Sequence, residues 1–240
     1  MNAVWNEMAA AWVHEGMSGF TSSGIALEMK STNYYHHQPI APRPNIVDVG
    51  GHVGIFSREM AKRYPSGQIF CIEPHPDNAE LARRNLADFP NAVVIESAVS
   101  YRGANLLHPF QSGSNSGGSQ LPPAGVATFE NATKFAEPIT VDTLKLEDLN
   151  LTSIDLLKLD CEGSEYEILA YCRLSTIREI VGEWHSVPGI PQFDRFCTET
   201  LPDWKLQTWG SLTGPLGLFR LASIVARNET ESVASLAAET

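Results

Sequence analysis

The chain has 240 residues, of which 43% are apolar and 19% charged, and this is the composition of a globular protein long enough for one α/β domain. Its net charge of −11 disfavours general binding to nucleic acid, which depends on Lys and Arg neutralising phosphates, so no nucleic-acid partner is expected. No apolar run reaches the roughly 18 residues of a membrane span. The four cysteines form no C-x-x-C pair and no signal-type leader precedes them, which favours free thiols in a cytoplasmic protein.

The N-terminal segment differs in pattern from the rest of the chain. Its first 16 residues carry apolar side chains at near-helical spacing: Val4, Trp5, Met8, Trp12 and Val13. This spacing predicts an amphipathic helix. Residues 1–44 are therefore expected to form a helical or loop extension that covers the functional site. Its aromatic and histidine stretch 33–39 is either a cover for the cofactor or acceptor or a loop packed on the sheet edge.

From residue 45 onward, apolar strands alternate with helical segments. The predicted strands are 45–50, 68–74, 92–99, 154–160 and 178–185, and the predicted helices are 55–64, 76–89, 164–172 and about 191–200. Two closing runs without a helix between them, 204–211 and 216–225, predict an antiparallel hairpin. The sequence thus predicts a single doubly wound, Rossmann-like α/β domain over 45–226, with a mostly parallel seven-stranded sheet and an antiparallel strand near its C-terminal end. The polar tail 227–240 is expected to fray.

A glycine-rich turn follows the first strand in the segment NIVDVGGHVGIF. A dinucleotide fingerprint, G-x-G-x-x-G, would need glycine at the position of Val49. The turn instead reads D-x-G-x-x-x-G through Asp48, Gly50 and Gly54, and it contains Gly51 and His52. An acidic residue here repels a pyrophosphate but attracts a ligand with a cationic amino group, such as S-adenosylmethionine. A plain turn-forming role for Asp48 is the alternative.

Two further strand ends carry candidate ligand contacts. Glu73 ends the second strand 23 residues after Gly50, where a carboxylate can accept both hydroxyls of a ribose, and Pro74 follows it. Ser97 and Ala98 end the third strand, where small side chains leave room for a flat adenine ring. Since a ribose carboxylate also serves nicotinamide enzymes, Glu73 indicates a nucleoside ligand without choosing between the two.

Four segments carry a resemblance to a known family: VDVGGHVGIFS, FCIEPHPDNAELARRNL, ESAVS and above all IDLLKLDCEGSEYEIL. They resemble the FkbM family of class I S-adenosylmethionine-dependent methyltransferases over about residues 45–186. The resemblance implies S-adenosylmethionine as cofactor and O-methylation of a natural-product or sugar hydroxyl. The turn departs from the family's more usual D-V-G-A-N-x-G at Gly51 and His52. The expected cofactor-binding residues are Asp48, Gly50, Gly51, His52, Gly54, Glu73, Pro74, Ser97, Ala98 and Asp160.

The ends of the fourth and fifth strands carry the candidate catalytic residues. His185 is the preferred general base because its unperturbed pKa lies near working pH, although a structural histidine fits equally well. Asp160 is expected to orient the sulfonium or the acceptor, and Glu183 is the remaining candidate base. Glu162 is a candidate contact or a helix cap. A divalent cation held by Asp160, Glu183 and His185 is an alternative that the spacing does not require, so no metal is predicted.

The acceptor is not identified by the sequence beyond a small molecule or sugar, and its pocket is expected in the segments 1–44, 101–136 and 186–215. Within these, the Gly- and Ser-rich stretch 111–125 predicts either a linker or a lid that closes over the acceptor. A nucleotide-dependent oxidoreductase and a non-catalytic cofactor-binding scaffold are the alternative functions. The oligomeric state stays open, a homo-oligomer included.

Overall fold

The computed structural model describes residues 3–7, 10–14, 41–109, 119, 121, 137–187, 189–209 and 216–224. The expectations for 33–39, for the tail 227–240 and for all but two residues of 111–125 lie outside these ranges. Within the described part of the chain, no helix is long and apolar enough to cross a membrane.

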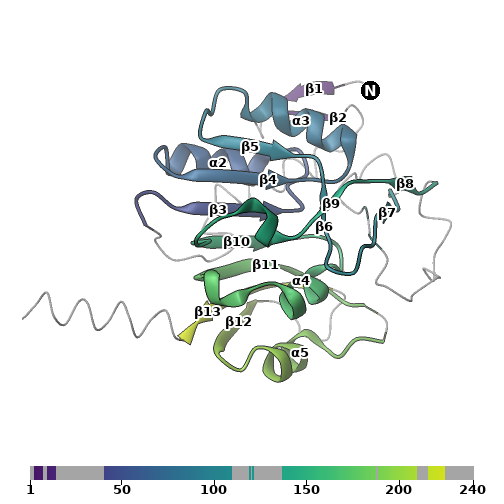
Figure 1. Ribbon diagram of the computed structural model, residues 1–240. Helices are drawn as coiled ribbons and strands as arrows, with labels where there is room; N and C mark the ends of the chain where they lie inside the picture. Colours follow the sequence, from purple (N-terminus) through teal and green to yellow (C-terminus); the bar gives the residue numbers. More distant parts are fainter. Residues whose placement is uncertain are drawn as a thin grey trace, which may run out of the picture.

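A seven-stranded sheet forms the centre of the protein (Figure 1). Its strands are β3 (Asn45–Val49), β4 (Gln68–Ile72), β5 (Ala92–Ile95), β10 (Leu156–Leu159), β11 (Glu179–His185), β12 (Trp204–Trp209) and β13 (Leu216–Ser223). They lie in the order β12-β13-β11-β10-β3-β4-β5, and only β13 runs antiparallel to its neighbours. The predicted fold class is confirmed, including the antiparallel closing hairpin.

Helices cover both faces of this sheet. They are α2 (Ile55–Arg63), α3 (Pro76–Leu86), α4 (Glu165–Tyr171) and α5 (Phe193–Thr200), with 3-10 turns at η2 (Leu146–Leu149) and η3 (Leu174–Thr176). Because side chains alternate along a strand, Ile46 of β3 packs in the cluster that holds Phe56 of α2, while Val47 packs with Tyr166 of α4 and Phe193 of α5. This alternation is the physical basis of the doubly wound arrangement.

Four short strands lie beside the carboxyl ends of β4 and β5. They are β6 (Ala98–Val99), β7 (Leu106–Leu107), β8 (Ile139–Thr140) and β9 (Thr143–Leu144). They form two small ladders, β6 with β9 and β7 with β8 (Figure 1). The predicted third strand, 92–99, is therefore two strands, because the chain turns at Ser97, whose N–H donates to the Ile95 carbonyl at 3.0 Å.

The prediction of an N-terminal helix is wrong for the described residues. They form a hairpin of β1 (Ala3–Asn6) and β2 (Ala11–His14) in which Trp5 pairs with Trp12, the two rings edge to face at 5.8 Å. Side chains alternate across the hairpin, with Ala11 and Val13 buried and Trp12 exposed, so the neighbouring apolar residues lie on opposite faces rather than along one helical stripe. Asn85 of α3 holds the hairpin, accepting from Trp12 N at 2.7 Å and donating to Trp12 O at 2.9 Å.

Candidate active site

The site lies where the strand order reverses, between β3 and β10, which is the usual ligand crevice of a doubly wound sheet. Gly50, directly after β3, has a left-handed φ of 76°, and a Cβ there would lie 1.8 Å from the Asp160 carbonyl oxygen. The backbone N–H groups of Gly50 and Gly51 both donate to the Ile72 carbonyl at 3.0 Å. Only glycine at position 50 lets the turn after β3 lie against the ends of both neighbouring strands.

The other two glycines of the turn serve packing. A Cβ at Gly51 would lie 2.3 Å from the Cys71 Sγ, so the thiol occupies the space that the family's more usual alanine would need. Gly54 has a φ of 79°, and a Cβ there would lie 3.2 Å from Ala82 in α3. The expectation that Gly54 lies beside the cofactor stays a prediction, and a larger residue there would also strain the packing against α3.

A buried ion pair lies beneath the turn. Lys158, in the centre of β10, has its Nζ 3.0 Å from the Asp48 Oδ1 and 3.6 Å from the Asp160 Oδ2, and it donates to the Gly50 carbonyl at 2.8 Å. Ser57 Oγ donates to the other oxygen of Asp48 at 2.7 Å. Burial alone would lower the pKa of Lys158, but the neighbouring carboxylates outweigh it and hold the pKa above its ordinary value. The lysine is therefore charged.

These contacts change the role expected of Asp48. Its side chain is fully buried and its charge is already paired with Lys158, so the geometry does not support a direct contact with a ligand ammonium. Asp48 instead fixes the turn from below. Sequence reasoning missed Lys158, although a single lysine within the apolar run LLKL was a visible signal, because a buried strand lysine requires a partner.

Glu73 holds the outer side of the turn. Its Oε2 accepts the His52 N–H at 2.9 Å, and its Oε1 accepts the His75 N–H at 3.0 Å and the Asn78 Nδ2 at 3.1 Å. Burial raises the pKa of Glu73, and these three hydrogen bonds oppose the shift. A carboxylate has about four acceptor positions, so one stays open for a ligand hydroxyl rather than the two expected from the sequence.

The remaining predicted contacts flank this carboxylate. Pro74 is half-buried and leads into α3, whose first turn His75 caps by accepting the Asp77 N–H. Ser97 and Ala98 are both buried, and Ala98 pairs with Thr143 of β9. The small residues therefore lie at the expected end of the sheet, on the side of β4 and β5.

The turn after β10 carries a second buried acid. Glu165, fully buried at the start of α4, accepts the N–H groups of Cys161 at 2.9 Å and Gly163 at 2.8 Å. It also lies 3.1 Å from the His185 Nδ1, while Glu162 Oε2 lies 3.5 Å from the His185 Nε2. Glu165, rather than Glu162, thus binds the backbone at the helix start. The second glutamate of the DCEGSE motif was the available signal for it.

The titration behaviour of this cluster differs from the expectation. Burial lowers the pKa of His185, but Glu165 and then Glu162 and Asp160 outweigh it and raise the pKa to about 10, so the imidazole is charged at neutral pH. Burial and neighbouring carboxylates raise the pKa of both Glu162 and Glu183 to about 7. The groups whose pKa lies near working pH are therefore glutamates, which favours Glu183 over His185 as the candidate base.

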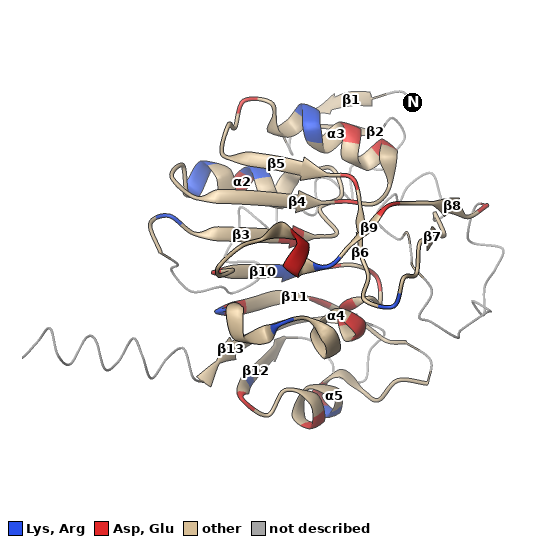
Figure 2. Cartoon of the chain, viewed as in Figure 1, with Lys and Arg blue, Asp and Glu red and all other residues tan. Residues whose placement is uncertain are grey.

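The three predicted catalytic residues do come together. Ligand atoms of Asp160, Glu183 and His185 all lie within 4.8 Å of one another, and each side chain is half-buried. Acidic residues follow the ends of β4, β5 and β10 (Figure 2), and Glu183 lies two residues before the end of β11. At the ends of β10 and β11, these carboxylates outnumber the cations Lys158 and His185, so the site favours a positively charged ligand.

The doubly wound sheet, with β13 antiparallel and a glycine turn at its switch point, defines a Rossmann-like methyltransferase fold. Residues 48–203 match the methyltransferase FkbM domain, so the chain belongs to this family, and the resemblance found in the sequence is confirmed. The crystal structure of a methyltransferase FkbM from Methylobacillus flagellatus KT superposes with a TM-score of 0.51 at 13% identity, over 90% of this chain and 56% of that chain. At this identity the likeness concerns the fold alone.

Relatives with assigned names are methyltransferases. The chain is 30% identical over 139 residues to the 2-O-methyltransferase NoeI of Sinorhizobium fredii, a match covering 54% of this chain and 57% of that protein. It is 26% identical over 201 residues to the methyltransferase sdnD of Sordaria araneosa, covering 71% of this chain and 78% of that protein. The chain thus spans little more than half the length of the first relative.

Proposed function

We propose that this protein transfers a methyl group from S-adenosylmethionine to a hydroxyl of a small molecule, sugar or natural product. The observation that carries the proposal is the placement of Glu73, a buried carboxylate clamped beside the glycine turn at the switch point, with one acceptor position left for a ribose hydroxyl. The excess of carboxylates around Asp160 suits the sulfonium and ammonium of this cofactor. Methylation of an oxygen atom is supported by the similarity to NoeI, which is named a 2-O-methyltransferase.

The chain's own residues divide the work of an in-line displacement. When bound, S-adenosylmethionine supplies a methyl carbon activated by its sulfonium. Asp160 lies at the end of β10, where its Oδ2 is 3.6 Å from the Lys158 Nζ, and it orients the reacting groups. Glu183 accepts the proton of the acceptor hydroxyl, because its pKa of about 7 leaves much of it deprotonated at neutral pH while keeping it basic. His185 stays charged and favours the carboxylate form of its neighbours.

Replacing Glu73 with alanine is expected to weaken binding of S-adenosylhomocysteine, the demethylated product, by about 10-fold or more. The change removes a charge-assisted hydrogen bond to the ribose, of about 1.5–3 kcal/mol, and frees the His52 and His75 N–H groups that shape the turn. Isothermal titration calorimetry measures the affinity for S-adenosylhomocysteine in both proteins. Glu96→Ala is the matched control, since it removes an exposed acid just beyond the next strand that pairs with Arg83.

Unchanged affinity in the Glu73→Ala protein would remove the ribose assignment. Titration with NAD in parallel separates this proposal from the alternative of a nucleotide-dependent oxidoreductase, which Val49 in place of the first fingerprint glycine disfavours. Detection of a methylated product separates it from a non-catalytic scaffold.

Asp160, Glu183 and His185 also have the donor types of a divalent cation site. The proposal uses no metal, because the Lys158 ammonium lies 3.6 Å from Asp160 and already supplies a positive charge there. Activity that persists in EDTA agrees with this. Activity that EDTA abolishes and Mg²⁺ restores would instead assign these three residues to a cation.

A further inference from the structure

A cavity of about 150 Å³ lies next to the turn after β10. Gly163 and Ser164 form part of its wall, and they belong to the same turn as Glu162 and Glu165, which contact His185. The cavity therefore shares this turn with residues that contact His185.

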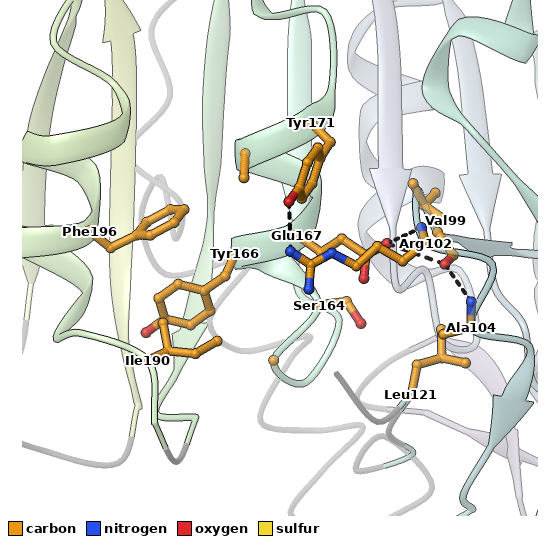
Figure 3. A pocket seen from close by; sticks show the side chains of 13 residues that line it. Val99, Arg102, Ala104, Leu121, Ser164, Tyr166, Glu167, Tyr171, Ile190 and Phe196 are labelled. Atoms are coloured by element: carbon orange, nitrogen blue, oxygen red, sulfur yellow. Dashed lines mark hydrogen bonds between the residues drawn. The ribbon is translucent and has the colours of Figure 1, made fainter. Parts of the chain in front are cut away.

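The walls of the cavity come from the segments in which the acceptor pocket is expected. Arg102 and Leu121 belong to 101–136, while Ile190 and Phe196 belong to 186–215. Tyr166 of α4 joins them, with its ring 4.9 Å from that of Phe196, edge to face (Figure 3). A cavity of this volume with apolar walls accommodates one six-membered ring.

One cation projects into this largely apolar space. The Arg102 guanidinium extends between Tyr171 and Tyr166 (Figure 3). Its Nη2 donates to the Tyr171 hydroxyl at 2.6 Å, and its Cζ lies 5.0 Å from the Tyr171 ring centroid. These two contacts hold the guanidinium in place on an otherwise mobile side chain.

The guanidinium keeps most of its hydrogen-bonding capacity. It has five N–H donors, of which the Tyr171 hydroxyl accepts one, and this hydrogen bond and then the nearby Glu167 carboxylate raise its pKa. Glu167 also lines the cavity, but its Oε1 already accepts the N–H groups of Tyr101 at 2.5 Å and Arg102 at 2.8 Å. A positioned guanidinium with free N–H groups matches the two oxygens of a carboxylate or similar oxyanion.

We propose that this cavity binds the methyl acceptor, and that the acceptor is a six-membered ring carrying a carboxylate or comparable oxyanion, which Arg102 recognises. This inference rests on the proposed methyltransferase function and adds the chemical class of the substrate. The ring lies against Tyr166 and Phe196, and the oxyanion lies at Arg102.

Two pairs of ring compounds test it by titration calorimetry in the presence of S-adenosylhomocysteine. The pairs are 4-hydroxybenzoate with 4-hydroxybenzamide, and glucuronate with glucose, so that each carboxylate has a neutral counterpart and the pairs separate an aromatic from a sugar ring. We expect one carboxylate to bind about 10-fold or more tightly than its neutral counterpart. Arg102→Gln should abolish this preference and leave S-adenosylhomocysteine binding unchanged, because Arg102 is exposed and is not among the expected cofactor-binding residues.

Arg195→Gln is the control, since Arg195 is an exposed arginine next to Phe196 that already pairs with Glu199 at 2.7 Å. It should keep the preference for the carboxylate. A preference that survives Arg102→Gln, or the absence of a preference in both pairs, would overturn the inference. If S-adenosylhomocysteine binds in these samples while the preference is absent, the assignment of the cavity alone fails. If S-adenosylhomocysteine itself does not bind, the proposed function fails.

Discussion

Replacing Glu183 with glutamine is expected to lower turnover by about 10²–10⁴-fold and to leave the affinity for S-adenosylhomocysteine nearly unchanged, because the amide cannot accept the hydroxyl proton. The dependence of kcat/KM on pH gives a second measurement. In the wild-type protein, kcat/KM should rise with pH through about 7 as Glu183 loses its proton, and level off above that value. In the Glu183→Gln protein, the remaining kcat/KM should no longer show the rise through about pH 7 that the titration of Glu183 causes.

His185→Gln distinguishes the two candidate bases. Because the His185 cation favours the carboxylate form of Glu183, removing it raises the pKa of Glu183 and moves the acidic limb to higher pH, with activity recovering there. If His185 were the base, activity would instead be lost at every pH. Glu162→Gln is the comparison variant, because it removes a second carboxyl group whose pKa is also raised to about 7 but which is not the proposed base. A Glu183→Gln protein with near-normal turnover would contradict the assignment.

Lys158→Met is expected to lower the free energy of unfolding by about 3–5 kcal/mol, as removal of one partner from a buried ion pair does. The change leaves the fully buried Asp48 without its cation, and the Gly50 carbonyl without a donor. Chemical denaturation with a two-state fit measures the loss.

The double variant Asp48→Asn/Lys158→Met should recover most of that stability, because no unpaired charge stays buried. Lys205→Met, at an exposed position of β12, should change stability by less than about 0.5 kcal/mol. A loss below about 1 kcal/mol in Lys158→Met would mean that the ion pair does not hold the turn.

Local periodicity predicted most of the fold. Helices α2, α3, α4 and α5 lie within about two residues of the predicted starts, because each has a clear apolar stripe and a turn before it. The N-terminal hairpin was missed for the opposite reason. Over 16 residues, tryptophan and valine at positions 4, 5, 12 and 13 match helical spacing, and the cross-strand pairing that overrides this spacing is not visible in the local pattern.

The site was predicted as a set of positions but not as a set of contacts. Sequence placed Asp160, Glu183 and His185 at neighbouring strand ends, and the structure brings them within 4.8 Å. It could not reveal that Lys158 neutralises Asp48, or that Glu165 raises the pKa of His185, because both effects depend on burial and on side-chain direction in three dimensions. The roles inferred for Asp48 and His185 therefore changed because they depend on neighbouring charges.

The central claim, that S-adenosylmethionine is held by the turn between β3 and α2, is tested most directly by amide hydrogen exchange with and without S-adenosylhomocysteine. We expect the ligand to slow exchange at residues 50–54 and 73–75, around the carboxylate of Glu73, and at 97–98, while the far hairpin of β12 and β13 is unaffected. Saturable binding with no protection at 50–54 and 73–75, or no binding at all, would contradict the account.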